Sequence, residues 1–163
     1  MGINLGGNFG MSNNDSMSVL NLQKNDILDL TKKNPGLKKV ILGAGWDISR
    51  NGADFDLDIA AFLLDSNNKF NTVSNVIFFN NPNGQGVTLS GDNRTGAGDG
   101  DDEQVQIELN SIPAEYNRLV FVVNIYDAKG RNQHFGMIQN AFIRIVNGSS
   151  NQELLASCLI LAP

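Results

Sequence analysis

Residues 52–64 read Gly-Ala-Asp-Phe-Asp-Leu-Asp-Ile-Ala-Ala-Phe-Leu-Leu, and this stretch indicates the kind of fold that the chain adopts. Its first half alternates carboxylates with apolar residues, which is the period of a β-strand. A strand places Asp54, Asp56 and Asp58 on one face and the apolar residues between them on the other. Residues 60–64 continue as an apolar run, which predicts that the strand becomes buried.

Similar short β-rich runs lie on both sides of this strand, separated by turns rich in Asn, Gly and Pro. We expect a single helical turn at residues 112–116. The run at residues 119–126 is almost entirely β-branched and aromatic, so we expect it at the centre of a sheet. The whole pattern predicts an all-β sandwich of short, mainly antiparallel strands. The expected strands lie at residues 19–22, 27–30, 40–47, 54–64, 76–79, 87–89, 105–109, 119–126 and 141–146.

A second acidic stretch, residues 91–103, reads Gly-Asp-Asn-Arg-Thr-Gly-Ala-Gly-Asp-Gly-Asp-Asp-Glu. Like charges a few ångströms apart repel by about 1 kcal/mol per pair even in water, so an ordered loop of this kind needs a counter-ion. Hard oxygen ligands on a flexible glycine-rich loop suit Ca²⁺, which takes six to eight oxygens. Only Arg94 opposes the negative charge, and we expect it to pair with carboxylates or carbonyls. The carboxylates are Asp92, Asp99, Asp101, Asp102 and Glu103.

The acidity of the chain is concentrated in these two stretches. Together they hold eight of the seventeen acidic residues and one of the twelve basic residues, leaving nine acids and eleven bases elsewhere. The net charge of −5 therefore reflects two local sites and not the whole surface. This distribution predicts a cation site assembled from both segments at one end of the sandwich. A solvated acidic loop that only connects two strands is the alternative.

Composition excludes several other classes of protein. At 163 residues, with 41% apolar and 18% charged residues, the chain has the balance of one globular domain. A single cysteine, Cys158, excludes an internal disulfide. An acidic chain without a basic patch argues against nucleic acid, and no apolar run is long enough to span a membrane. We expect the only histidine, His134, on the surface, and Trp46 in the core.

The two ends of the chain differ from its middle. Residues 1–16 are rich in Gly, Asn and Ser, and we expect a flexible extension there, followed by the β-sandwich domain at residues 17–163. Residues 155–163 form an apolar tail, for which we expect either a divergent final strand or a truncated end. An exposed apolar tail would favour self-association.

Five motifs occur in an order that resembles the TerD family of tellurium-resistance and stress proteins over residues 17–155. The motifs are Gly43-x-Gly45-Trp46-Asp47, residues 52–64, Phe79-Asn80-Asn81, residues 91–103 and Asn140-Ala141-Phe142-Ile143-Arg144. The resemblance implies a cytoplasmic β-sandwich that binds Ca²⁺ and has no established catalytic activity. Its implied partners are other stress and tellurium-resistance proteins, with the membrane surface as one location. The resemblance assigns the calcium role to Asp54, Asp56, Asp58, Asp92, Asp99, Asp101, Asp102 and Glu103.

Two alternatives use the same acidic site. One family member is described as binding cyclic AMP, which keeps a cyclic-nucleotide ligand open. The other alternative is a metal-dependent phosphoester hydrolase, in which the carboxylates hold Mg²⁺ or Mn²⁺ to activate water. Against the hydrolase, the sequence shows no second histidine and no convergent group of Lys or Arg to hold a phosphate.

Overall fold

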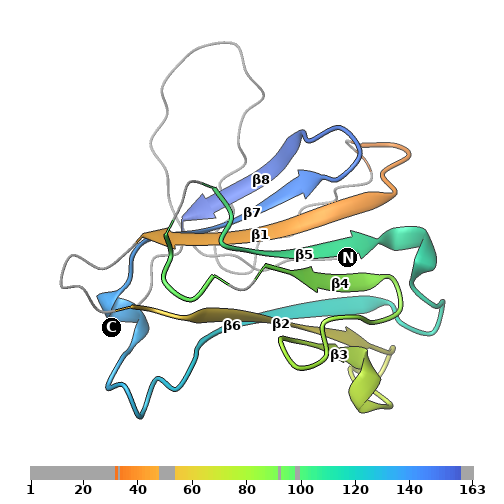
Figure 1. Cartoon of the computed structure of the whole chain (residues 1–163). Coiled ribbons are helices and arrows are strands. Elements are labelled where there is room, and N and C mark those ends of the chain that lie inside the picture. Colours follow the sequence, from red (N-terminus) through yellow and green to blue (C-terminus); the bar gives the residue numbers. More distant parts are fainter. Residues whose placement is uncertain (1–31, 33, 48–53, 92, 98–99, 159–163) are drawn as a thin grey trace.

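Two antiparallel sheets lie face to face as the layers of a sandwich in the computed structural model, which describes residues 32, 34–47, 54–91, 93–97 and 100–158 (Figure 1). The strands are β1 (Lys39–Asp47), β2 (Leu57–Leu64), β3 (Val76–Ile77), β4 (Val87–Ser90), β5 (Glu103–Glu108), β6 (Arg118–Ile125), β7 (Gln139–Asn147) and β8 (Glu153–Cys158). Three short 3-10 helices complete the named elements: η1 (Val73–Asn75), η2 (Leu109–Ser111) and η3 (Phe135–Met137).

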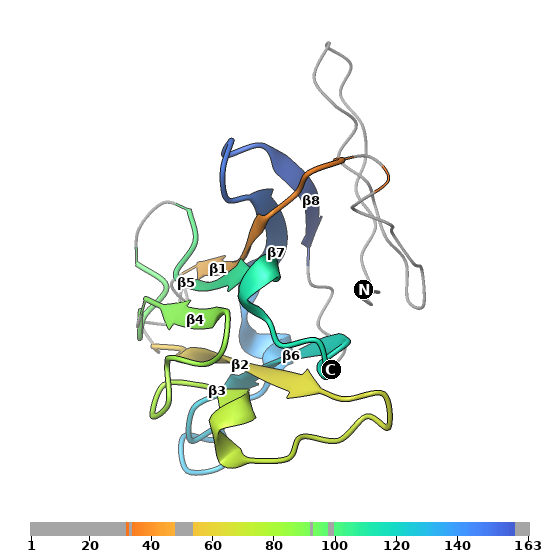
Figure 2. The same ribbon diagram turned by 90° about the vertical axis from the view of Figure 1, so that its right-hand side faces the viewer.

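The larger sheet has the strand order β4-β5-β1-β7-β8, and the smaller one has the order β3-β2-β6. All strand pairs between neighbours are antiparallel. Figure 2, turned by 90°, shows the five-stranded layer curving above the three-stranded one. The predicted all-β sandwich of mainly antiparallel strands is therefore confirmed.

The core lies between the two sheets and is built by alternation along the strands. In β5, for example, Val105 and Ile107 are buried while Gln104 and Gln106 are partly exposed. A second, smaller apolar cluster lies at one end of the sandwich, where β1 and β6 end and β2 and β7 begin. It consists of Trp46, Phe55, Leu57, Ile125 and Ala141. This end carries the residues that the sequence analysis singled out.

Several sequence predictions can be compared with these elements. The strands expected at residues 40–47, 54–64, 87–89, 105–109 and 141–146 are all present, with shifted ends, and the one at 76–79 is shorter. Trp46 is buried in the core and His134 is exposed, as expected. The apolar tail forms β8 as far as Cys158 and pairs with β7. The expected extension at residues 1–16 and the strands at 19–22 and 27–30 lie outside the described residues.

Two predictions about local structure were wrong. The run at 119–126 forms β6, which lies at the end of the described three-stranded sheet and not at its centre. Two of its valines lie on an open face, since Val120 is 37% exposed and Val122 is 44% exposed. The helical turn expected at 112–116 is absent, and the 3-10 turn lies just before it, at Leu109–Ser111. Pro113 instead begins a turn that is closed by the bond from Tyr116 N to its carbonyl.

Candidate functional site

The aspartates of residues 54–58 lie on the face of their segment that points away from the second apolar cluster. Phe55 and Leu57 each keep only 2% of their surface exposed, and they anchor the segment in that cluster. Asp56 and Asp58 are nevertheless also buried, with only 7% of the surface of each exposed, whereas Asp54 is exposed. Burial of carboxylates on the polar face shows that other segments cover this face.

A pocket of about 820 Å³ forms where these segments meet. Its walls bring the three aspartates of residues 54–58 together with part of the acidic loop. The acidic loop contributes Gly91, Arg94 and Thr95, and the segments after β3 and β6 contribute Phe79, Tyr126, Arg131 and Gln133. The expectation that the two acidic stretches meet at one end of the sandwich thus holds for these residues. In Figure 1 the described part of the loop lies at the left-hand end of the sandwich.

This pocket also corrects one expectation. The sequence showed no convergent Lys or Arg group near the acidic stretches, but Arg94 and Arg131 both line the pocket. Arg131 follows β6 in a different part of the chain. Its approach to the aspartates depends on the pairing of β6 with β2, in which Asp58 lies opposite Asn124. No local pattern in the sequence indicates this approach.

Asn93 organises the described part of the acidic loop. Its side-chain oxygen accepts bonds from the backbone N–H groups of Thr95 and Gly96, both at 3.1 Å. Its amide nitrogen donates to the Ala97 carbonyl at 2.9 Å and to a carboxylate oxygen of Asp102. One side chain therefore closes the turn and ties it to the acidic residue that precedes β5. Such Asx-type bonds fix a loop without help from a sheet.

Asp102 and Glu103 fasten the loop to both layers of the sandwich. Asp102 accepts a bond from the backbone N–H of Trp46 at 2.8 Å. Glu103 reaches across to the other sheet, where Oε2 accepts a bond from the backbone N–H of Ile59 at 2.7 Å. Glu103 is 2% exposed and Asp102 is 8% exposed. Both carboxylates therefore have structural partners in the backbone.

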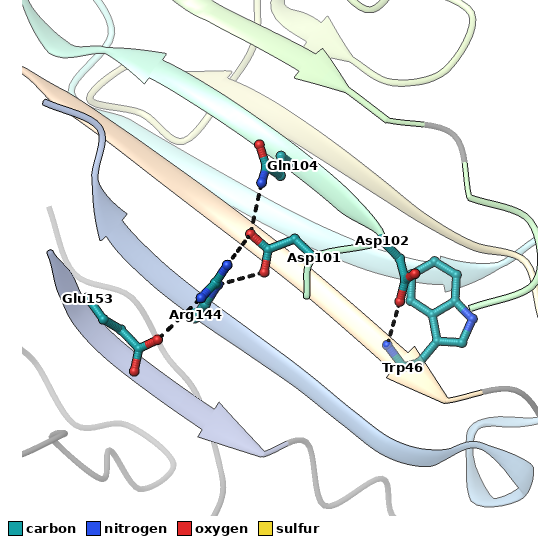
Figure 3. Close-up of polar contacts among 6 residues, drawn as sticks. All are labelled: Trp46, Asp101, Asp102, Gln104, Arg144 and Glu153. Atoms are coloured by element: carbon teal, nitrogen blue, oxygen red, sulfur yellow. Dashed lines mark hydrogen bonds and ion pairs between the residues drawn. The ribbon is translucent and has the colours of Figure 1, made fainter. Parts of the chain in front are cut away.

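Asp101 has a different position, on the outer side of the five-stranded sheet (Figure 3). Arg144 on β7 donates from Nε to Oδ1 at 2.7 Å and from Nη2 to Oδ2 at 3.1 Å, and Gln104 donates at 3.0 Å. The Asp101 side chain is only 1% exposed. Gly43 on β1 leaves space for it, because a Cβ at this position would collide with the Asp101 carboxylate. Asp101 is thus a structural anchor that lies outside the pocket lining.

The eight predicted ligands therefore fall into three groups according to their position. Asp54, Asp56 and Asp58 line the pocket. The three acids of residues 101–103 are bonded to other parts of the sandwich, and Asp92 and Asp99 lie outside the described residues. Within the described ranges, no three His, Cys, Asp or Glu side chains are close enough together to hold a metal ion. A cation in the pocket would therefore need oxygen atoms of other kinds as well.

A comparison with known proteins identifies the family of this sandwich. The sequence model of the TerD domain matches residues 17–159. The chain belongs to the TerD family. Relatives include general stress protein 16U of Bacillus subtilis, 48% identical over 141 residues, with 84% of this chain and 73% of that protein covered. The tellurium resistance protein TerD of Serratia marcescens is also 48% identical over 141 residues, with 85% and 73% covered.

Solved structures share the TerD fold. The structure of the TerD homologue SCO6318 from Streptomyces coelicolor A3(2) matches with a TM-score of 0.59 and 25% identity, covering 75% of this chain and 72% of that one. The structure of SAV2460, described as a protein of unknown function, matches with a TM-score of 0.62 and 29% identity. It covers 75% of this chain and 71% of that chain. In the part of this TerD chain that the structure describes, no helix is long and apolar enough to cross a membrane.

Asp102 makes the stability of this TerD domain depend on pH. Burial raises the pKa of Asp102, although the bonds from Trp46 and Asn93 oppose the shift. Because the pKa is higher in the folded state, the folded state holds the proton more tightly than the unfolded chain. The favourable contribution of Asp102 to the free energy of unfolding is therefore complete below its ordinary pKa of 3.8. This contribution is lost as the pH rises through the raised pKa of the folded state.

We therefore expect the free energy of unfolding of the native protein to fall, relative to that of Asp102→Asn, as the pH rises from below 3.8 to neutrality. Urea unfolding of both proteins in the presence of chelator, at a series of pH values, measures this difference. The contributions of the other titrating groups cancel, because both proteins share them. A difference that stays constant or grows in favour of the native protein would contradict the prediction.

Proposed function

We propose that this TerD protein is a non-enzymatic, calcium-binding module of a cytoplasmic stress or tellurium-resistance system, acting through contacts with other proteins of that system. One observation carries the proposal: the pocket where Asp58 of β2 and the two aspartates just before this strand meet the glycine-rich loop. The names of the relatives, a general stress protein and a tellurium resistance protein, support the biological setting.

The donor chemistry of the pocket fits a hard cation. Gln133 donates from Nε2 to the Asp54 carbonyl at 2.9 Å, which fixes the orientation of its amide. Its Oε1 atom is buried and accepts no hydrogen bond from any described residue. An unsatisfied buried acceptor costs about 1–3 kcal/mol, so a ligand that it could bind would relieve this cost. Ca²⁺ accepts amide carbonyl oxygens together with carboxylates, and it tolerates irregular geometry.

Asp54, Asp56, Asp58 and Gln133 are the described residues that offer oxygen atoms to the ion, with Asp92 and Asp99 of the loop as further predicted ligands. Because no three acidic side chains of the described residues are close enough together to hold one ion, at most two of these three aspartates would bind it directly. A bound Ca²⁺ would neutralise the aspartates and link the two acidic segments. The protein's own contribution is to hold these groups in place. Phe55 and Leu57 anchor the aspartate segment, while Asn93 closes the loop on the other side.

Calcium is expected to stabilise the fold against heat. A ligand that binds only the folded state, present at ten times its dissociation constant, adds about 1.4 kcal/mol. For a domain of this size, that free energy raises the melting temperature by roughly 3–6 °C. Mg²⁺ should do less, because it requires a tight octahedron and loses its water reluctantly. The measurement is a thermal melt of chelator-stripped protein with Ca²⁺, with Mg²⁺ and with neither.

The variant Asp56→Asn removes one pocket charge and should reduce the calcium-dependent shift. Glu115→Gln is the matched control, because Glu115 is an exposed acid outside the pocket lining. If Ca²⁺ leaves the melting temperature of the native protein unchanged, or if both variants respond as the native protein does, the calcium site does not exist and the loop is a solvated connection.

A further inference from the structure

One wall of the pocket is cationic and aromatic, in contrast to the aspartate wall. The guanidinium carbon of Arg131 lies 5.4 Å from the centre of the Tyr126 ring, which is a cation–π contact. The Tyr126 ring meets the Phe79 ring edge to face, at 6.2 Å and 85°. Phe79 is 47% exposed and Tyr126 is 45% exposed, and all three side chains line the pocket. A flat apolar group and an anion could both be bound here.

The chain holds this wall in a fixed position relative to the aspartates. At one end, Tyr126 N donates to the Asp56 carbonyl at 2.8 Å. At the other end, the Gln133 side chain donates to the Asp54 carbonyl. Between them, the Arg131 N–H bonds to the Asp127 carbonyl at 2.9 Å, which closes the turn. Because both ends are tied to the aspartate segment, Arg131 remains beside the aspartates without a ligand to place it.

The charges of the two walls determine when an anion can enter. Three aspartates and the two arginines that line the pocket, Arg94 and Arg131, give it a formal charge of about −1 at neutral pH. A bound divalent cation changes this charge to about +1, so the field at Arg131 becomes attractive for an anion. Arginine offers planar paired donors that match the oxygens of a phosphate.

We propose that the calcium-loaded pocket binds a phosphate monoester that carries a flat apolar group. The phosphate lies at Arg131, and the flat group packs against Phe79 and Tyr126. This inference rests on the proposed calcium site, because the cation supplies the change in charge. Cation and phosphate then strengthen one another's binding by the same factor, as linkage requires.

Phenyl phosphate is the probe, since it combines a phosphate monoester with one flat ring. In calorimetric titrations of the full chain, we expect saturable binding that is at least about tenfold tighter with saturating Ca²⁺ than in chelator. Methyl phosphate, which lacks the ring, should bind more weakly than phenyl phosphate. The substitution Phe79→Ala should reduce this preference for the ring and leave the binding of methyl phosphate unchanged.

Arg131→Gln is the deciding variant, and Arg118→Gln is its matched control. Both arginines are exposed, but Arg118 lies at the start of β6, outside the pocket lining. Arg131→Gln should weaken the binding of phenyl phosphate by about tenfold or more, as expected for a charged bond to phosphate. Its affinity for calcium in the absence of phosphate should change far less. Arg118→Gln should behave as the native protein does.

The outcomes separate this inference from the proposed function. If calcium binds but phenyl phosphate does not, or if Arg131→Gln binds phenyl phosphate as tightly as the native protein, the phosphate site is refuted and calcium binding stands. Equal phenyl phosphate affinity with and without calcium would also refute the inference. If calcium does not bind, the proposed function and this inference both fail, because the inference needs the cation to change the charge of the pocket.

Discussion

Replacing Arg144 by methionine is expected to lower the free energy of unfolding by about 3 kcal/mol, because it leaves a buried carboxylate without its charged partner. Arg144 donates to both oxygens of Asp101, whose side chain is 1% exposed. The bond to Asp101 raises the pKa of Arg144, which shows that the folded state favours the charged pair. Methionine keeps an apolar stem of similar length, so the lost interaction is mainly the paired charge.

The magnitude follows from the geometry of the pair. Removing one partner of a buried ion pair typically costs about 3–5 kcal/mol. Since the Arg144 side chain is itself 34% exposed, water can partly reach the pair, and we expect the low end of this range. A loss of this size lowers the melting temperature by roughly 6–12 °C. Urea unfolding in the presence of chelator measures it without a contribution from calcium.

Lys39→Met provides the matched control on the same sheet. Lys39 pairs with Glu108 at 3.2 Å, but these side chains are 29% and 51% exposed. An ion pair of this kind contributes less than about 1 kcal/mol. If Arg144→Met is no more destabilising than Lys39→Met, Asp101 is not the buried anchor that the structure shows.

The local period of the chain was sufficient to predict the aspartate wall of the pocket. Acidic and apolar residues alternate along residues 54–59 of the sequence. In the structure, Phe55, Leu57 and Ile59 are buried, each with 2% or less of its surface exposed. Period and side-chain direction are coupled within a single strand, so no distant contact is needed to predict the face of each residue. The same reasoning predicted most of the strands.

The parts that could not be predicted depend on contacts between distant segments. Arg131 and Gln133 reach the aspartates only through the pairing of β2 with β6. The acidic pattern made Asp101 and Glu103 equivalent candidates for a metal. In the structure, Asp101 bonds to Arg144, 43 positions away, and Glu103 bonds to Ile59, 44 positions away. A run of carboxylates indicates negative charge, but it does not indicate which carboxylates accept hydrogen bonds from distant parts of the chain.

The wrong position of β6 has a similar physical cause. A high content of valine and phenylalanine shows that a segment fits a pleated surface, but it does not distinguish an edge strand from a central one. In β6 the inward residues Leu119 and Ile125 are buried, while Val120 and Val122 lie on the exposed face. Both faces of β6 carry apolar residues, although Arg118 and Asn124 lie on the outer one, so apolar content alone does not reveal the place of the strand in its sheet.

Gly96→Ala in the acidic loop is expected to destabilise the domain by about 4 kcal/mol, from two causes that add. Gly96 has a φ of +71°, where an L-residue with a side chain costs about 1–2 kcal/mol. In addition, a Cβ at this position would lie 2.6 Å from Nε1 and 2.8 Å from the carbonyl oxygen of Trp46. Overpacking of this kind costs about 1–3 kcal/mol.

Trp46 cannot move aside without a further loss. It is 3% exposed, and its Nε1 donates to the Phe55 carbonyl at 2.9 Å. The control is Gly36→Ala, because Gly36 also has a positive φ, +89°, but a Cβ there would meet nothing within 4 Å. That variant should lose only the backbone term, about 1–2 kcal/mol. Trp46 is the only tryptophan of the chain, so its fluorescence follows urea unfolding of both variants and reports directly on the contact. If the two glycine variants are equally stable, the loop does not pack on Trp46, and the geometry that brings it to the aspartate pocket is wrong.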